Sequence, residues 1–156
     1  MSNVIHINTK LGKFHLNIKV SLVNGINCFF GPSGAGKTSI INCIAGLTQP
    51  EEAKIIINKN ILTDTKNRVF KAIHKRGIGY VFQDSRLFPH LNIKHNLLYG
   101  YRLNSTFNKV FVFNEIIKLL DLEFLLDRFP NHLSGGQKQR VAIGRALLSQ
   151  PKLLLM

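Results

Sequence analysis

The chain has 156 residues, of which 45% are hydrophobic and 19% charged, and its formal net charge is +13. This length fits one ordinary domain, and this composition is typical of a globular protein with a packed core. No apolar run approaches the roughly eighteen residues of a membrane span, and the N-terminus lacks the layout of a signal peptide, so we expect a cytosolic protein.

The alternation of apolar and polar residues predicts strands at 2–7 and 14–20. The continuous apolar run INCFF at 26–30 predicts a strand buried on both faces. Two further strands are predicted at 54–58 (KIIIN) and 78–82 (IGYVF), separated by a polar stretch. Between the third and fourth of these strands, SIINCIAGL has the apolar spacing of a helix.

The second half of the chain predicts helices. We expect residues 86–108 to be irregular and residues 109–126 to form an amphipathic helix. A long helical pattern begins at Ser134 and ends before Pro151, and KLLLM after it predicts a buried strand. Strands that are separated by helical crossovers indicate an α/β protein.

The basic charge admits nucleotides, nucleic acid or an anionic membrane surface as partners. Lysine and arginine are scattered, and only KAIHKR at 71–76 resembles a cluster, which we expect to be a solvated loop. Cys28 and Cys43 lie in apolar surroundings without CxxC spacing and are predicted to be buried free thiols. The histidines, His90 and His95 among them, have no metal-ligand spacing.

The segment GPSGAGKT fits the phosphate-loop pattern GxxxxGK[ST], between a predicted strand and a predicted helix. Glycines let successive backbone N–H groups point into one concavity, to which the helix N-terminus adds partial positive charge. The candidate nucleotide-binding residues are Gly31, Pro32, Ser33, Gly34, Ala35, Gly36, Lys37, Thr38 and Ser39. The alternative is a glycine-rich turn without a ligand, which the flanking elements disfavour.

A second candidate anion site lies at the start of the long helix. Ser134 and Gln137 have the spacing of a capping box, with Gly135 and Gly136 directly after the cap. The two glycines leave the first-turn amides open to a ligand, which a cap needed only for stability does not require. The alternative is a well-capped helix without a ligand.

The motifs GPSGAGKT, YVFQDSRLFPH and LSGGQKQRVAIGRALL, in this order, resemble the Walker A loop, Q-loop and signature motif of an ABC transporter ATP-binding subunit. Within that family the chain is most similar to molybdate importer ATPases. The resemblance implies a P-loop NTPase fold with a mixed sheet, with its core at about 1–85 and 134–156 and a helical subdomain at about 86–133. The whole chain, 1–156, would be a partial nucleotide-binding domain that is incomplete at its C-terminus.

The resemblance also implies how ATP and Mg²⁺ are bound. Lys37 and the loop backbone would hold the phosphates, and Thr38 with Gln83 would ligate Mg²⁺. In a head-to-tail dimer, Ser134, Gly135, Gly136 and Gln137 would face the ATP of a second nucleotide-binding subunit. Phe14 is the candidate for stacking on adenine, although a core phenylalanine on a strand is the alternative.

The resemblance further implies a transmembrane permease partner, contacted near Phe88-Pro89-His90-Leu91, and a peripheral location at the cytoplasmic face of the membrane. We expect the Phe-Pro loop to be exposed. The family's Walker B Asp and catalytic Glu would follow Leu153 to Met156, and the chain ends there. From this we expect ATP binding with negligible hydrolysis by the chain alone, because a positioned general base is worth about 10² to 10⁴ in rate.

The sequence is also compatible with functions other than transport. A non-catalytic nucleotide-binding module, or the remnant of an interrupted gene, would retain binding without turnover. Nucleic-acid binding is suggested by the charge alone and is disfavoured because no groove-reading motif accompanies it. We therefore expect no nucleic-acid partner.

Overall fold

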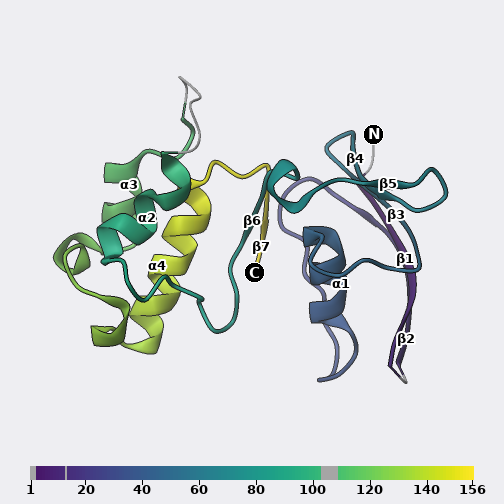
Figure 1. Cartoon of the computed structure of the whole chain (residues 1–156), viewed down its shortest axis with the longest axis horizontal. Coiled ribbons are helices and arrows are strands. Elements are labelled where there is room, and N and C mark those ends of the chain that lie inside the picture. Colours follow the sequence, from purple (N-terminus) through teal and green to yellow (C-terminus); the bar gives the residue numbers. More distant parts are fainter. Residues whose placement is uncertain (1–2, 13, 103–108) are drawn as a thin grey trace. The chain divides into compact units, whose positions relative to one another are not determined.

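The structure is a computed structural model that describes residues 3–12, 14–102 and 109–156. Two compact units make up the chain, residues 1–76 and residues 77–156 (Figure 1). Each unit has its own sheet and its own buried side chains. The combination of strands and helices confirms the predicted α/β class.

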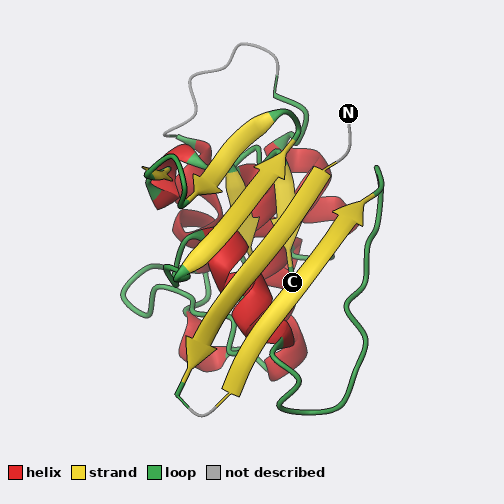
Figure 2. Cartoon of the chain, turned by 90° about the vertical axis from the view of Figure 1, so that its right-hand side faces the viewer, coloured by secondary structure: helices red, strands yellow, loops and turns green. Residues whose placement is uncertain are grey.

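The first unit is built on a five-stranded antiparallel sheet, whose long strands lie side by side in Figure 2. Its strands are β1 (Asn3–Leu11), β2 (Phe14–Leu22), β3 (Glu52–Ile57), β4 (Asn60–Asp64) and β5 (Val69–Phe70), in the order β2-β1-β3-β4-β5. Alternate residues of β1, such as Ile5 and Ile7, are buried, while their neighbours are less so. This alternation is the one that predicted the first two strands, and both are confirmed.

The described residues of the first unit include one α-helix, α1 (Lys37–Ala45). Ile40, Cys43 and Ile44 make up much of its buried side. Gly46 caps its C-terminus with a φ of 85°, a left-handed conformation that glycine adopts at little cost. The predicted burial of Cys43 is confirmed, and desolvation raises the pKa of its thiol, an effect that the nearby Arg76 partly opposes.

The strand predicted at 26–30 is wrong. This segment forms no strand in the structure, its cysteine Cys28 is exposed, and the side chains of Ile26 and Phe30 are almost completely exposed. An all-apolar strand must be covered on both of its faces, and this segment belongs to neither of the two sheets of the described residues. Two of those strands, β4 and the very short β5, were not predicted.

The expectation of a solvated basic loop at 71–76 is wrong at its last position. Lys75 is exposed in a short 3₁₀ turn, η1 (Ile73–Lys75), but Arg76 is only 4% exposed. Its guanidinium donates hydrogen bonds to backbone carbonyls and to a threonine hydroxyl inside the unit. The charge is therefore part of the interior rather than of the surface.

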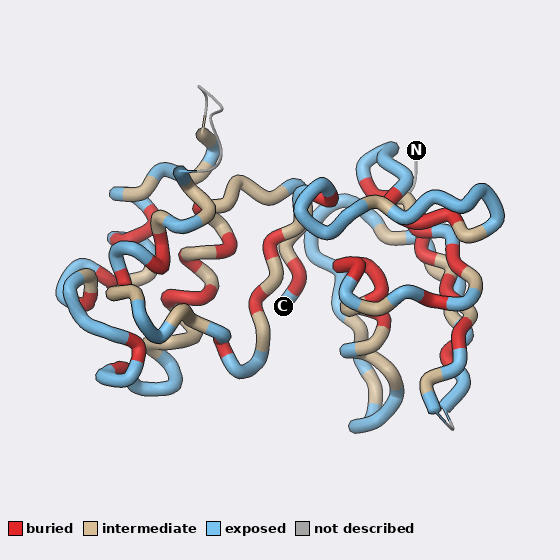
Figure 3. The backbone as a smooth tube through the Cα atoms, viewed as in Figure 1, coloured by how far each residue is buried: buried red, intermediate tan, exposed pale blue. Residues whose placement is uncertain are grey.

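The second unit combines two parallel strands with a helical core. The elements are β6 (Ile78–Tyr80), α2 (Ile93–Tyr101), α3 (Phe113–Leu119), two 3₁₀ turns η2 (Glu123–Leu125) and η3 (Pro130–His132), α4 (Gly135–Leu148) and β7 (Leu153–Leu155). Figure 3 shows buried positions recurring along α4, which packs against α2. The buried apolar cluster comprises Ile93, Leu97, Ile116, Ile117, Leu122, Leu125, Leu133, Val141 and Leu148.

The structure corrects two expectations for this unit. Residues 86–108 are not irregular throughout, because α2 occupies 93–101; residues 103–108 lie outside the described part of the chain. The amphipathic helix predicted at 109–126 is shorter, since α3 ends at Leu119 and a 3₁₀ turn follows. Asp121 has a φ of 51° between the two, and this left-handed residue interrupts the helix.

The long helix from Ser134 and the strand in KLLLM are confirmed as α4 and β7, although Leu155 alone among the three residues of β7 is buried. None of the helices in the described ranges is both long enough and apolar enough to cross a bilayer.

Candidate nucleotide-binding site

The phosphate loop leads directly into α1. Gly34 and Gly36 have φ values of 81° and 87°, so both occupy the left-handed region that glycine adopts readily. Gly36 is also the N-cap of α1, and its carbonyl accepts the first helical hydrogen bond from Ile40 N at 2.9 Å. The sequence folds in this way because glycine stands at the positions where the backbone must turn.

Lys37 lies over the loop that precedes it. Its Nζ donates hydrogen bonds to the carbonyl oxygens of Gly31, at 2.8 Å, and Pro32, at 2.6 Å. These contacts keep the ammonium charge at the loop instead of in free solvent. The lysine side chain is therefore already positioned beside the loop in which a phosphate would bind.

A hollow of about 460 Å³ joins the loop to the start of β2. It is lined by Leu11, Phe14, Ser33, Gly34, Gly36, Lys37, Thr38 and Ser39. The Phe14 ring contacts the loop closely, since a Cβ added to Gly36 would lie 2.9 Å from its Cε1 atom. The structure therefore brings Phe14 together with the predicted phosphate-binding residues, and Leu11 is a lining residue that sequence reasoning missed.

Phe14 is 40% exposed, so its ring is a wall of this hollow rather than a core residue. A flat, partly exposed aromatic ring next to a phosphate-binding loop can stack on a nucleotide base. Its role toward adenine stays a prediction.

The start of α4 has the predicted capping box. Ser134 Oγ accepts a hydrogen bond from Gln137 N at 3.3 Å, and Gln137 Oε1 accepts one from Ser134 N at 2.9 Å. Apart from the adjacent residues and the backbone of α4 itself, no atom of the described residues lies within 4 Å of a Cβ added to Gly135 or Gly136. The first turn of α4 is thus open to an approaching ligand, although nothing within the unit requires glycine there.

Thr38 and Gln83 belong to different units. Thr38 lines the hollow of the first unit, whereas Gln83 lies exposed in a turn after β6 of the second. Their joint ligation of Mg²⁺ stays a prediction. Among the described residues, no group of three or more His, Cys, Asp or Glu side chains is arranged to hold a metal ion.

The loop at 88–92 is held by a residue that sequence reasoning missed. Asn96 on α2 is completely buried, and its Oδ1 accepts a hydrogen bond from Phe88 N at 2.9 Å. Its Nδ2 donates to the carbonyls of Phe88, Leu91 and Asn92 at 3.1, 2.9 and 3.1 Å. One side chain therefore fixes the shape of the loop, and nothing in the sequence pattern distinguishes it from a surface asparagine.

The expectation of an exposed Phe-Pro loop is only partly correct. Pro89 and His90 are exposed, but Phe88 is half-buried, with its ring centroid 4.4 Å from that of Tyr99. The Arg145 guanidinium of α4 lies over the Phe88 ring at 5.1 Å and donates to the carbonyl of Ser85 at 3.1 Å. Burial lowers the pKa of Arg145, which is the desolvation expected of a cation packed between a loop and a helix.

We expect the substitution Asn96→Ala to lower the free energy of unfolding of the second unit by about 2 kcal/mol, because it leaves several loop groups without their partner. Urea unfolding followed by tyrosine fluorescence measures this unit selectively, since the three tyrosines, Tyr80, Tyr99 and Tyr101, all belong to it. The matched control Asn131→Ala changes an exposed asparagine and should leave the midpoint unchanged. Equal midpoints for both variants would contradict the role given to Asn96.

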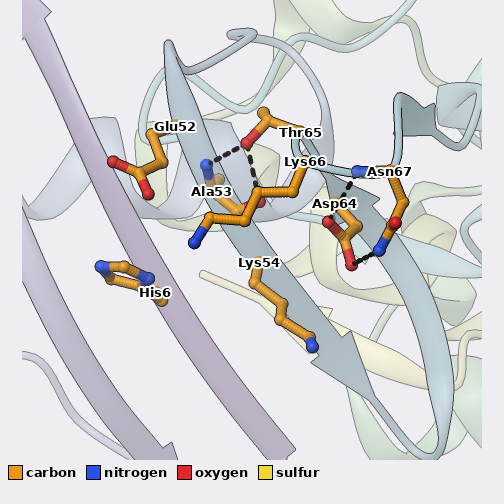
Figure 4. A pocket seen from close by; sticks show the side chains of 8 residues that line it. All are labelled: His6, Glu52, Ala53, Lys54, Asp64, Thr65, Lys66 and Asn67. Carbon is orange, nitrogen blue, oxygen red and sulfur yellow. Dashed lines mark hydrogen bonds between the residues drawn. The ribbon is translucent and has the colours of Figure 1, made fainter.

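A second hollow of about 170 Å³ lies over β3 and the turn after β4 (Figure 4). Asp64, one of its charged lining residues, is bound by Asn67 through both the backbone N–H and the side-chain amide. These hydrogen bonds lower the pKa of Asp64. Thr65 Oγ1 is likewise engaged by the backbone of Ala53. Because these groups already have partners within the hollow, it is a weaker candidate for ligand binding than the hollow at the phosphate loop.

The phosphate loop, the adjoining aromatic ring and the open capping box are the features of an ATP-binding cassette. Residues 16–156 match the family described as ABC transporter, and the chain belongs to that family. It is 53% identical over 154 residues to the Molybdenum import ATP-binding protein ModC of Aliivibrio fischeri, across 98% of this chain and 41% of that protein. The protein of the same name from Rhizobium etli is 47% identical over 156 residues, across 100% of this chain and 44% of its own length.

The chain thus spans about two fifths of the length of the curated relatives it matches. Among solved structures, a dimeric ATP-binding cassette in a post-hydrolysis state, bound to ADP and Pi, matches with a TM-score of 0.70 and 29% identity. That match covers 99% of this chain and 72% of the other. The family resemblance predicted from the three motifs is therefore confirmed, and so is the ABC ATPase fold class.

Proposed function

We propose that the chain binds ATP in the hollow between the phosphate loop and Phe14. The observation that supports this best is that one hollow is lined both by loop residues, including Lys37, and by an aromatic ring. The backbone N–H groups at 31–38, which every residue there except Pro32 has, would hold the phosphates, and Lys37 would reach the β- and γ-phosphates as a point charge. Ser39 in the first turn of α1 and the Phe14 ring would complete the site.

We propose that Thr38 and Gln83 hold Mg²⁺ when the nucleotide is bound. A hydroxyl and an amide carbonyl are oxygen donors of the kind that Mg²⁺ prefers. Held by these two residues, the ion would supply positive charge that offsets part of the phosphate charge. The side chain of Gln83 is exposed, so its carbonyl oxygen is accessible to a ligand.

We infer that a second nucleotide-binding subunit completes the site, in a head-to-tail dimer. The open first turn of α4, at Ser134, Gly135, Gly136 and Gln137, would bind the γ-phosphate of the partner's ATP. Amide N–H contacts to an anion are strong. Dimer closure would therefore depend on whether the γ-phosphate is present.

We propose that the whole protein is the ATP-binding subunit of an importer, that its substrate is molybdate, and that it couples ATP hydrolysis to transport. The curated relatives are named as molybdenum import ATP-binding proteins. In this proposal Phe88, Pro89, His90 and Leu91 contact the permease at the cytoplasmic face of the membrane, and residues of about 86–133 act as a helical subdomain. The Asn96 hydrogen bonds support a loop of fixed shape that a partner can dock on.

A titration calorimetry experiment on the full chain tests nucleotide binding. We expect one site for MgATP and for inorganic tripolyphosphate, and we expect Phe14→Ala to weaken ATP about tenfold, because base stacking on an aromatic ring is worth about 1–3 kcal/mol. Tripolyphosphate, which has no base, should bind the variant as it binds the original chain. The control Phe124→Ala removes an exposed ring of the second unit and should change neither affinity. Absence of binding by the original chain would overturn the proposal.

A further inference from the structure

Arg76 is a buried cation that the proposed nucleotide chemistry does not use directly. Its Nε donates to the carbonyl of Lys71 at 2.8 Å, and its Nη1 donates to the carbonyl of Ile44 at 2.8 Å and to that of Cys43 at 3.3 Å. Its Nη2 donates to Thr63 Oγ1 at 3.1 Å. The four hydrogen bonds hold the guanidinium in one place.

These partners belong to three different parts of the first unit. Cys43 and Ile44 lie in the last turn of α1, Thr63 lies on β4, and Lys71 follows β5. The Phe70 ring also lies under the guanidinium, with its centroid 4.7 Å from Cζ. Arg76 therefore fastens the C-terminal end of α1 to the sheet.

A guanidinium group is well suited to the C-terminal end of a helix. The last carbonyls of a helix carry partial negative charge and lack helical partners, so a buried cation can be held there without a carboxylate. Within the described ranges of the chain, no carboxylate forms a salt bridge with Arg76. The planar guanidinium can reach several carbonyls at once, which the ammonium group of a lysine cannot do with the same geometry.

The other end of α1 forms the proposed nucleotide site. Lys37 and Thr38, its first residues, line the hollow whose opposite wall is Phe14 on β2. Phe14 belongs to the sheet and the phosphate loop belongs to α1, so the width of the hollow depends on how α1 lies against the sheet. Protein interiors are closely packed and transmit strain, so a displacement at the C-terminal end of α1 is passed on to its N-terminal end.

We propose that Arg76 is a positioning residue that holds α1 at the distance from the sheet at which the loop and Phe14 can bind the phosphates and the base of one nucleotide together. This inference rests on the proposed nucleotide site. It separates two contributions to binding: the phosphate contacts are local to the loop at 31–38, whereas the base contact depends on the placement of α1. Arg76 therefore governs the preference for a nucleotide over a bare polyphosphate.

The test compares the affinities of MgATP and inorganic tripolyphosphate for the full chain and for Arg76→Lys and Arg76→Met. We expect each substitution to weaken ATP about fivefold to tenfold, which is the loss of most of a base stack, and to change tripolyphosphate less than twofold. Arg68→Met is the matched control, because Arg68 is an exposed arginine of the same unit. Neither affinity should change in that variant.

Equal losses for both ligands would overturn the proposal, because they indicate a general loss of structure. Unchanged affinity for both would overturn it as well. If the Arg76 variants do not fold, the test uses Thr63→Val, which removes one of the four hydrogen bonds. A lowered ratio of the ATP affinity to the tripolyphosphate affinity supports the proposal, and an unchanged ratio contradicts it. Failure of the original chain to bind either ligand, or of Phe14→Ala to lose ATP preference, would instead count against the nucleotide site itself.

Discussion

The chain with Lys37→Ala should bind MgATP about a hundredfold more weakly than the original chain. Hydrogen bonds to charged groups contribute about 1.5–3 kcal/mol, and Lys37 is the one charged residue among the described residues that line the hollow at the phosphate loop. The substitution also removes its bonds to the carbonyls of Gly31 and Pro32, but these oxygens lie in a partly exposed loop that water can reach. The affinity loss therefore reflects the missing phosphate contact rather than a collapsed loop.

The affinity is measured by equilibrium titration at one fixed ionic strength. This is necessary because exposed positive charges attract ATP and salt weakens that attraction. Lys75→Ala is the matched control: it removes the same charge from an exposed position of the same unit. We expect that control to stay within about twofold of the original affinity. If Lys37→Ala and Lys75→Ala weakened binding equally, the loss would reflect net charge alone, and the specific role of Lys37 would be refuted.

The functional motifs could be predicted because their chemistry is local. Gly34 and Gly36 stand where the loop backbone enters the left-handed region, and Ser134 and Gln137 bond to one another three residues apart. Such features depend on neighbours in the sequence, and the structure has them where the pattern indicated. The first two predicted strands, β1 and β2, belong to the same category, since each alternates with a period of two.

What could not be predicted depends on distant contacts. In the sequence, Arg76 cannot be distinguished from other basic loop residues, nor Asn96 from other polar helix residues. Their hydrogen-bond partners are set by tertiary packing. The apolar run at 26–30 was mistaken for a strand for a related reason. An apolar composition indicates that a segment can be buried in a sheet. Whether the segment joins the sheet depends on which strands pair with one another in the folded chain.

The substitution Gly46→Ala should destabilise the first unit by about 2–5 kcal/mol. Gly46 has a φ of 85°, and forcing an alanine into the left-handed region costs about 1–2 kcal/mol. A Cβ at this position would also lie 2.5 Å from Arg76 Nε and 2.7 Å from its Cζ. The guanidinium cannot move aside without breaking its hydrogen bonds to α1 and β4, so the overlap adds about 1–3 kcal/mol.

Hydrogen exchange of the amides in α1 and β4 measures this loss, because it reports the free energy of opening of the first unit separately from the second. Gly25→Ala is the matched control, since Gly25 has a φ of 99° but, apart from its two chain neighbours, no atom of the described residues within 4 Å of an added Cβ. It should show the backbone cost alone. If Gly46→Ala lowered the free energy of opening no more than Gly25→Ala does, the guanidinium would be able to move away from the added Cβ. Arg76 would then hold α1 less firmly than its four hydrogen bonds imply.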